Sequence, residues 1–334
     1  MRSQTVCQAR IEVSALGFGC VQLTTHPTRA EALRTLEHAL ACGITHFDVA
    51  RAYGFGRAEG ILGEFLRGKR DRVTVATKFG LQPPSGLVGN RWVIDAAKRI
   101  LAPFPALLKR AKRHGETAGS QDFSPQAAMQ SLHTSLRELG TDYVDFLLLH
   151  EATLADARSA PLLEALQQEV ANGTVRAVGV ASSSGRLGRD AGKLPPAFEI
   201  VQFSDNALED SSTLTNMEGR TLITHSVFAP VRVLLNAAHA HGQLVEDYST
   251  RIAADLRNPA VIGSLLLQHA LHSNPRGVVL FSSVRPERIS ANAKAVESSS
   301  WSSAQIALFM EFVDTITRWD QPGTPQPAAH TDAS

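Results

Sequence analysis

Short apolar segments alternate along the chain with longer segments that have helical periodicity. The apolar segments are rich in β-branched residues, and several are almost continuously apolar, as is typical of strands buried on both faces. Eight segments predict strands: Ala15–Cys20, His46–Ala50, Arg72–Lys78, Tyr143–His150, Val175–Ala181, Glu199–Ser204, Leu222–Val227 and Gly277–Ser283. Eight strands joined by helices predict an α/β fold, a single parallel (β/α)8 TIM barrel. An open doubly wound sheet is the structural alternative.

Two of the predicted helices have recognisable ends. Thr28 is expected to cap the helix Arg29–Ala41. Ser124 followed by Pro125 is an N-cap with proline at the first helical position, and it opens a helix that runs to about Leu139. Three leucines of this second helix recur at helical spacing and are expected to face the barrel: Leu132, Leu136 and Leu139.

Two regions depart from the alternation. Gly80–Asp122 is longer than a strand-to-helix connection requires, and it is rich in lysine and arginine. The simpler interpretation is a solvated helical face, and the alternative is a lid that favours an anionic substrate. The residues from Gln321 onward are small, polar or proline and predict a disordered tail. We therefore expect one domain over 1–320 and a disordered tail over 321–334.

Composition excludes several classes of partner. The chain has 33 lysine and arginine residues against 32 aspartate and glutamate residues, so neither nucleic acid nor a membrane is expected to bind it through charge. Three cysteines without a C-x-x-C pair favour a reducing compartment. The first residues are not typical of a signal peptide, and no apolar stretch is long enough to span a membrane. A cytoplasmic protein is expected.

Ionisable residues stand at the ends of three successive predicted strands. Asp48 lies near the end of the second strand, Lys78 ends the third and His150 ends the fourth, while Tyr53 lies in the loop after Asp48. In a TIM barrel the site forms at this end of the strands. A phenol is a poor acid at neutral pH unless a neighbour stabilises its phenolate, which an ammonium held by a carboxylate can do. Singly, these residues have structural explanations: a turn cap for Asp48 and rim positions for Lys78 and His150.

Four segments carry a resemblance to a known family. They are Phe47–Gly54 (FDVARAYG) continued by Glu59, Leu62 and Gly63; Thr77-Lys78; Ser135-Leu136 to Leu139 with Asp142–Asp145; and Gly173–Val180 (GTVRAVGV). Together they resemble the aldo-keto reductases, and the resemblance extends from about Leu16 to Asn292. It implies that Tyr53 is the general acid–base, that Asp48 and Lys78 tune it, and that His150 orients the carbonyl. It also implies hydride transfer from NADPH to a small-molecule carbonyl, or the reverse from an alcohol.

The resemblance extends to cofactor-binding positions, with departures. Gln202 and Ser182 match positions at the nicotinamide carboxamide, although Ala181-Ser182 replaces the usual Ser-Asn. His225, followed by Ser226, stands where an aromatic residue stacks on the nicotinamide. Three residues match the family's adenosine segment: Ser283, Arg288 and Asn292. Ser282 and Ala291 replace its lysine and glutamate, so NADPH is the expected cofactor and NADH is possible.

No metal site is expected, because no H-E-x-x-H or similar ligand spacing occurs and His239 and His241 fit a helix end. Two alternative functions follow from the same residues. Lys78 could be the Schiff-base amine of a barrel aldolase or isomerase. The chain could also be an accessory protein that binds the nucleotide with little turnover. The sequence fixes neither the substrate nor the oligomeric state, which stays unknown.

Overall fold

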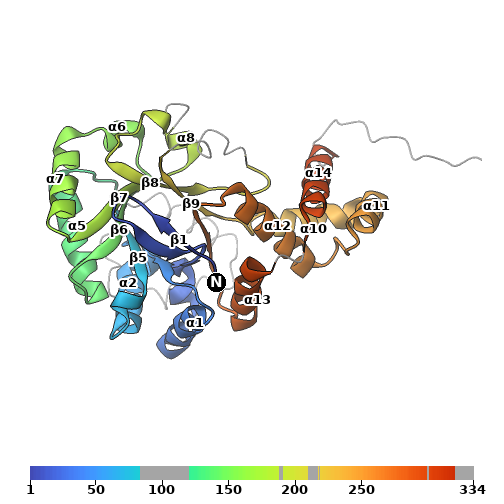
Figure 1. The fold of residues 1–334 in the computed structure, drawn as a ribbon, viewed down its shortest axis with the longest axis horizontal. Coiled ribbons are helices and arrows are strands. Elements are labelled where there is room, and N and C mark those ends of the chain that lie inside the picture. Colours follow the sequence, from blue (N-terminus) through green and yellow to red (C-terminus); the bar gives the residue numbers. More distant parts are fainter. Residues whose placement is uncertain (83–119, 188–190, 210–216, 218, 299–300, 320–334) are drawn as a thin grey trace, which may run out of the picture.

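The structure is a computed structural model that describes residues 1–82, 120–187, 191–209, 217, 219–298 and 301–319. Its centre is a closed barrel of eight parallel strands (Figure 1). In order around the barrel they are β10 (Val278–Phe281), β3 (Leu16–Gly19), β4 (His46–Asp48), β5 (Thr74–Phe79), β6 (Val144–His150), β7 (Val175–Ala181), β8 (Phe198–Ser204) and β9 (Thr221–His225). All eight predicted strands are confirmed, to within two residues at each end. The alternative of an open sheet is wrong, because β10 pairs with both β9 and β3 and so closes the ring.

A two-stranded antiparallel hairpin that the sequence pattern did not reveal precedes the barrel. It consists of β1 (Ser3–Val6) and β2 (Ile11–Ser14), each only four residues long. Val6, Ile11 and Val13 of this hairpin form one buried cluster with inward-facing residues of the barrel strands. The hairpin therefore closes the barrel interior on the side where the strands begin.

The two helices with predicted ends form as expected. Thr28 accepts a hydrogen bond from the Glu31 amide at the start of α1 (Arg29–Ala41). Ser124 caps α5 (Pro125–Leu139) in the same way, and Gly140 ends it in the left-handed region at φ 65°. Of its three leucines, Leu132 and Leu139 are buried and Leu136 is partly buried against the core.

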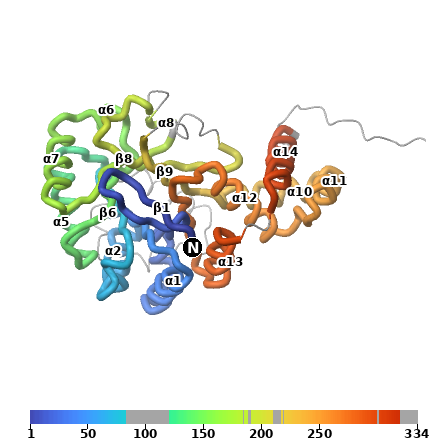
Figure 2. Tube along the Cα trace, in the orientation of Figure 1, coloured from blue at the N-terminus to red at the C-terminus, as the bar shows by residue number. Residues whose placement is uncertain are grey.

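Further helices surround the barrel or extend from it. They are α2 (Arg57–Leu66), α6 (Leu154–Ala157), α7 (Ala160–Ala171), α8 (Ser184–Leu187), α10 (Val231–Ala240), α11 (Gly242–Ile252), α12 (Pro259–Ser273), α13 (Pro286–Glu297) and α14 (Ser303–Trp319). His239 and His241 lie at the end of α10, as predicted. Helices α10, α11 and α14 pack on one another to one side of the barrel, and Figure 2 shows the chain entering them after β9.

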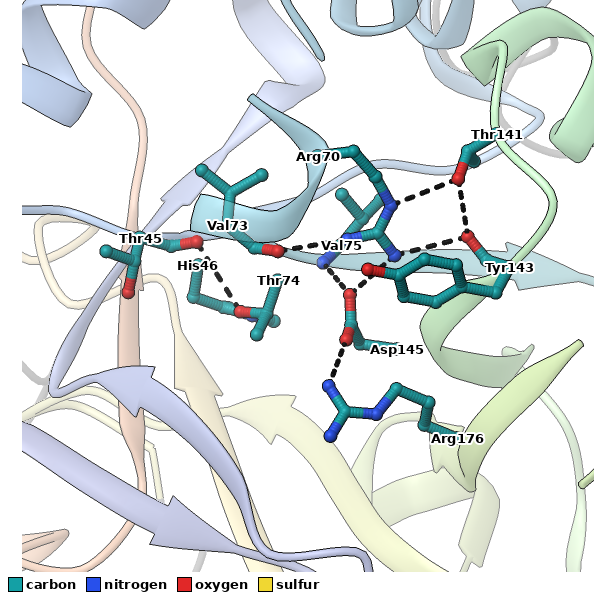
Figure 3. Close-up of polar contacts among 10 residues, drawn as sticks. All are labelled: Thr45, His46, Arg70, Val73, Thr74, Val75, Thr141, Tyr143, Asp145 and Arg176. Carbon is teal, nitrogen blue, oxygen red and sulfur yellow. Dashed lines mark hydrogen bonds and ion pairs between the residues drawn. The ribbon is translucent and has the colours of Figure 1, made fainter. Parts of the chain in front are cut away.

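A buried polar network ties together the beginnings of three barrel strands (Figure 3). Asp145 of β6 is 1% exposed and accepts hydrogen bonds from Arg70 Nη2 at 2.7 Å, Arg176 Nη1 at 2.9 Å and the Val75 amide at 2.9 Å. The guanidinium of Arg70 also lies 3.8 Å from the ring centre of Tyr143. In a TIM barrel this end of the strands contributes to stability, while the opposite end holds the site.

Parts of two predictions lie outside the described residues. The ends of the long connection are described, where Leu81 pairs with Gln121 and the Asp122 amide donates to the Gly80 carbonyl. The helical face or lid expected in this connection concerns 83–119, and the disordered tail concerns 321–334; neither segment is described. Among the described helices, none has both the length and the apolar character needed to cross a membrane.

Candidate active site

The carboxyl ends of the barrel strands surround a cavity of about 300 Å³. Strand register brings three predicted residues to this edge: Asp48 ends β4, Lys78 lies one residue before the end of β5, and His150 ends β6. The residues that line the cavity are Gly19, Val21, Asp48, Tyr53, Lys78, His150, Glu151, Ala181, Gln202, His225, Ser226, Val227, Phe228, Ala229, Leu280, Phe281 and Ser282. The four predicted catalytic residues therefore share one cavity.

Lys78 is the centre of the polar contacts in this cavity. Its Nζ donates to Asp48 Oδ1 at 2.5 Å, to the Val49 carbonyl at 3.3 Å and to Tyr53 Oη at 3.3 Å. Both Lys78 and Asp48 are 2% exposed. An ammonium can only donate, so the Tyr53 oxygen accepts from Lys78 and its own proton stays free to be donated elsewhere.

Burial and charge act in opposite directions on these groups. Burial raises the pKa of Tyr53 and outweighs the lowering by the Lys78 ammonium. The phenol is thus protonated at neutral pH. Burial lowers the pKa of Lys78, but Asp48 and Tyr53 more than offset it, and the pKa is raised overall. Lys78 is therefore a charged ammonium over the physiological range.

Tyr53 is held by an unusual turn. Three residues in succession after it adopt left-handed backbone angles: Gly54 at φ 58°, Phe55 at φ 58° and Gly56 at φ 82°. A Cβ at Gly54 would lie 2.2 Å from Thr24 Cγ2, so only glycine lets the loop before α1 approach this closely. The sequence Tyr-Gly-x-Gly therefore fixes where the phenol lies.

His150 faces Tyr53 across the cavity. The two rings lie with centroids 6.1 Å apart and planes at 83°, in an edge-on arrangement. Burial, reinforced by the nearby Lys78 ammonium, lowers the pKa of His150 to about 3. Its imidazole is thus neutral at physiological pH and offers one hydrogen-bond donor and one acceptor.

A buried ion pair behind the site was not recognised from the sequence as a supporting group. Glu59 of α2 is fully buried and contacts Arg51 Nη1 at 2.5 Å and Thr77 Oγ1 at 2.7 Å. It joins the loop that leads to Tyr53 with the residue next to Lys78. The available signal was an acidic residue on the apolar face of a predicted helix, since an acid is rarely fully buried unless it is paired.

The predicted nicotinamide-binding residues divide into two groups. Gln202, His225 and Ser226 line the cavity. Gln202 Nε2 donates to Asp48 Oδ2 at 2.9 Å, and its Oε1 is buried without a hydrogen-bond partner among the described residues. Ser182 is buried outside the cavity lining, and its hydroxyl donates to the Ala152 carbonyl at 2.7 Å. The Ser182 hydroxyl therefore does not direct its proton into the cavity, where the contact with the nicotinamide carboxamide was expected.

The predicted adenosine residues lie beyond the cavity. Ser283 Oγ accepts from the Arg285 amide at 3.1 Å in the turn before α13. Arg288 is exposed and Asn292 is half-buried on α13. Ser282, which follows β10 and directly precedes Ser283, lines the cavity itself.

An unsatisfied buried oxygen allows the fit of a nicotinamide cofactor to be tested. Buried polar atoms without partners are rare in proteins and mark places where a ligand can supply the missing hydrogen bond. The Gln202 oxygen lacks only a donor, and a primary carboxamide provides one. Among the described residues, no group of three or more histidine, cysteine, aspartate or glutamate side chains could hold a metal ion.

Comparison with known proteins connects this site to a family. The sequence model of the Aldo/keto reductase family matches residues 15–231. D-threo-aldose 1-dehydrogenase of Pseudomonas sp is 30% identical over 321 residues, covering 86% of this chain and 90% of that protein. 6-Dehydroglucose reductase of Agrobacterium fabrum is 34% identical over 181 residues, covering 52% of this chain. The chain thus spans about half (51%) of the length of that relative.

Solved structures show the same fold. An aldo-keto reductase from Bacillus halodurans in its holo form superposes with a TM-score of 0.69 at 20% identity, covering 95% of this chain and 96% of the other. The glycerol dehydrogenase of Gluconobacter oxydans superposes with a TM-score of 0.67 at 18% identity, covering 97% and 98%.

Proposed function

Because the chain belongs to the aldo/keto reductase family and is an oxidoreductase acting on carbonyl or alcohol groups, we propose that it uses NADPH and that Tyr53 is its general acid. The observation that carries the proposal is the contact of Lys78 Nζ with both Asp48 Oδ1 and Tyr53 Oη. This arrangement keeps the phenol proton of Tyr53 at the cavity and places the positive charge of Lys78 beside the phenol oxygen, where it can stabilise the phenolate that forms when the proton is donated.

Each of the four residues then has one task. Tyr53 donates its proton to the oxygen of the substrate carbonyl, and Lys78 stabilises the phenolate that remains. Asp48 keeps Lys78 charged and oriented. His150 is neutral and donates a hydrogen bond to the carbonyl oxygen from the facing side. NADPH, when bound, supplies the hydride to the carbonyl carbon.

The cofactor is held at two places in this proposal. Gln202 Oε1 accepts from the carboxamide of the nicotinamide, and His225 provides the neighbouring ring surface. Burial lowers the pKa of His225, so its ring is neutral and does not add charge there. At the other place, Arg288 pairs with the 2′-phosphate, supported by Ser283 and Asn292. The exposure of Arg288 fits a group that binds a phosphate at the protein surface.

A Schiff-base function of Lys78 finds no support in these contacts. Such chemistry requires a neutral amine that can attack a carbonyl. The ammonium of Lys78 is instead paired with Asp48, and its pKa is raised. Binding of nucleotide with little turnover remains the outcome that would contradict the proposed catalysis.

The test is reduction of simple aldehydes by the purified protein, followed by the loss of NADPH absorbance. Tyr53→Phe should lower kcat by about 10²- to 10⁴-fold, the usual contribution of a general acid, while NADPH still quenches protein fluorescence at the same concentration. Tyr143→Phe is the matched control, because its ring stacks on Arg70 at the opposite end of the barrel and the phenylalanine preserves that contact. Equal turnover by Tyr53→Phe and the wild type would exclude Tyr53 as the acid.

A further inference from the structure

Gln202 lies opposite Asp48 in the barrel, and the two ends of its amide have different surroundings. Around the ring, β8 is four strands from β4, so the two side chains meet across the barrel interior, where both are 2% exposed. The Gln202 oxygen is the end that the proposed function assigns to the nicotinamide carboxamide. The nitrogen donates to Asp48 Oδ2 at 2.9 Å, and the proposed function leaves this second contact without a role.

The Asp48 carboxylate is held through both of its oxygens. Lys78 Nζ donates to Oδ1 at 2.5 Å, and Gln202 Nε2 donates to Oδ2. A carboxylate this deeply buried depends on such donors, because little water reaches it and an unpaired buried charge is costly. The two donors come from different strands, β5 and β8, so together they fix the orientation of the carboxylate as well as its position.

The orientation of Asp48 affects Tyr53 through Lys78. The ammonium has three protons, and its described acceptors are three oxygen atoms: Asp48 Oδ1, the Val49 carbonyl and Tyr53 Oη. The contact with Tyr53 is the longer one, at 3.3 Å against 2.5 Å for the contact with Asp48. Without the Gln202 donor, Asp48 Oδ2 loses its partner, and the carboxylate gains most by turning both oxygens toward Lys78. That rotation draws Nζ away from the phenol.

We propose that Gln202 is a positioning residue for the proposed proton donor Tyr53, in addition to its proposed contact with the cofactor. Its N–H fixes Asp48 Oδ2, and the carboxylate so fixed leaves Lys78 directed at the phenol. This inference rests on the proposed role of Tyr53 as the acid. Gln202 itself neither gives nor takes a proton. Because an amide that accepts a hydrogen bond at its oxygen donates more strongly from its nitrogen, the two tasks of the side chain reinforce each other.

Two variants of similar length separate the ends of the amide. Gln202→Met removes both the oxygen and the N–H. Gln202→Glu keeps an acceptor oxygen for the carboxamide but places a second carboxylate beside Asp48. Two carboxylates this close share one proton, and that proton can replace the missing N–H. Since the shared proton is lost as the pH rises, the defect of Gln202→Glu should depend on pH.

The first measurement is kcat for a simple aldehyde at saturating NADPH, compared with the wild type at the same pH. In Gln202→Met we expect kcat to be about tenfold lower at every pH, as for one lost hydrogen bond to a charged group. In Gln202→Glu it should be close to that of the wild type near about pH 5 and should fall by about the same factor toward about pH 8. The matched controls are Gln167→Met and Gln167→Glu, exposed changes on α7 that should leave kcat unchanged.

A second measurement requires neither turnover nor cofactor. The chain has three tyrosines, so protein carrying ¹³C at the tyrosine Cζ gives three signals in a nuclear magnetic resonance spectrum, and Tyr53→Phe identifies that of Tyr53. The titration midpoint of this signal should be higher in Gln202→Met than in the wild type by about half a pH unit or more, because Lys78 then supports the phenolate less. The comparison is made at pH values where circular dichroism shows both proteins folded.

Three results would overturn the inference. Unchanged kcat in both variants, with only a raised KM for NADPH, would mean that Gln202 serves the cofactor alone. A loss of kcat in Gln202→Glu that is the same at every pH would mean that the substitution disturbs the site in general. An equal titration midpoint of Tyr53 in Gln202→Met and the wild type would exclude the effect on the phenol. Full turnover by Tyr53→Phe would instead contradict the proposed function, and the titration in the free protein does not depend on that result.

Discussion

Gln202 Nε2 lies 2.9 Å from Asp48 Oδ2, so a residue of β8 holds a residue of β4 across the mouth of the barrel. The contact determines the orientation of the amide, because a carboxylate accepts hydrogen bonds and the NH2 group must therefore face Asp48. Within the part of the chain that the structure describes, the Gln202 oxygen is left buried and without a hydrogen-bond partner. The same side chain thus connects the proposed proton-donating group with the proposed nicotinamide position.

Gln202→Leu should weaken NADPH binding by about fivefold, because one hydrogen bond to the carboxamide is lost and a typical hydrogen bond contributes about 1 kcal/mol. Fluorescence quenching by NADPH measures the Kd. Gln167→Leu, on the exposed surface of α7, should leave the Kd unchanged. A Kd for Gln202→Leu equal to that of the wild type would show that the orphaned oxygen does not bind the cofactor.

Arg288→Ala should discriminate between the two nicotinamide cofactors. We expect the Kd for NADPH to rise about tenfold or more, since a hydrogen bond to a charged group contributes about 1.5–3 kcal/mol. The Kd for NADH should stay the same, because NADH has no 2′-phosphate. Parallel titrations with both nucleotides measure the ratio, and Arg137→Ala on α5 is a control of equal charge change. Weakening of both cofactors alike would argue against a phosphate contact.

Glu59→Gln should lower the free energy of unfolding by about 3 kcal/mol, because the charge of Arg51 then has no buried counterion. Urea denaturation measures the change. Replacing both partners, in Arg51→Met with Glu59→Met, should cost less than the sum of the two single changes, since neither charge is left alone. Additive losses would show that the two side chains do not depend on each other.

The stability of the protein should fall as the pH is lowered from about 6.5 to about 4, in part because of His46. Burial lowers the pKa of His46 from 6.5 to about 4. Its Nδ1 contacts Thr74 Oγ1 at 2.9 Å (Figure 3), and its Nε2 has no hydrogen-bond partner among the residues that the structure describes. Between these values the unfolded chain binds a proton that the folded chain does not, so stability increases with pH across this window. His150 acts with the same sign.

His46→Gln isolates this contribution, because glutamine can still donate to Thr74 and does not titrate. Urea unfolding at pH 4.5, 5.5, 6.5 and 7.5 should give a shallower rise of the unfolding free energy for the variant. The whole contribution of His46 is roughly 3 kcal/mol between pH 7 and pH 4. Parallel curves for the variant and the wild type would show that His46 is not kept neutral by the fold.

The sequence predicted the barrel because its signals are local. Near-continuous apolar runs such as the one ending at His150 mark strands buried on both faces, and caps such as Thr28 and Ser124 mark helix starts. It also predicted that Asp48, Lys78 and His150 meet, since parallel strands end at the same edge. The hairpin of β1 and β2 escaped prediction, because two four-residue strands give too few alternating positions to be distinguished from a loop.

What the sequence by itself determined is therefore the number and order of the strands and which side chains stand at their ends. Only the tertiary structure decided that β10 returns to β3, that Gln202 reaches Asp48, and that Ser182 directs its hydroxyl to Ala152 instead of the cavity. It also decided the direction of the Tyr53 pKa, where burial outweighs Lys78. The physical reason is that periodicity and capping depend on near neighbours in the chain, whereas ring closure, side-chain direction and burial depend on residues more than a hundred positions apart, such as Gln202 and Asp48.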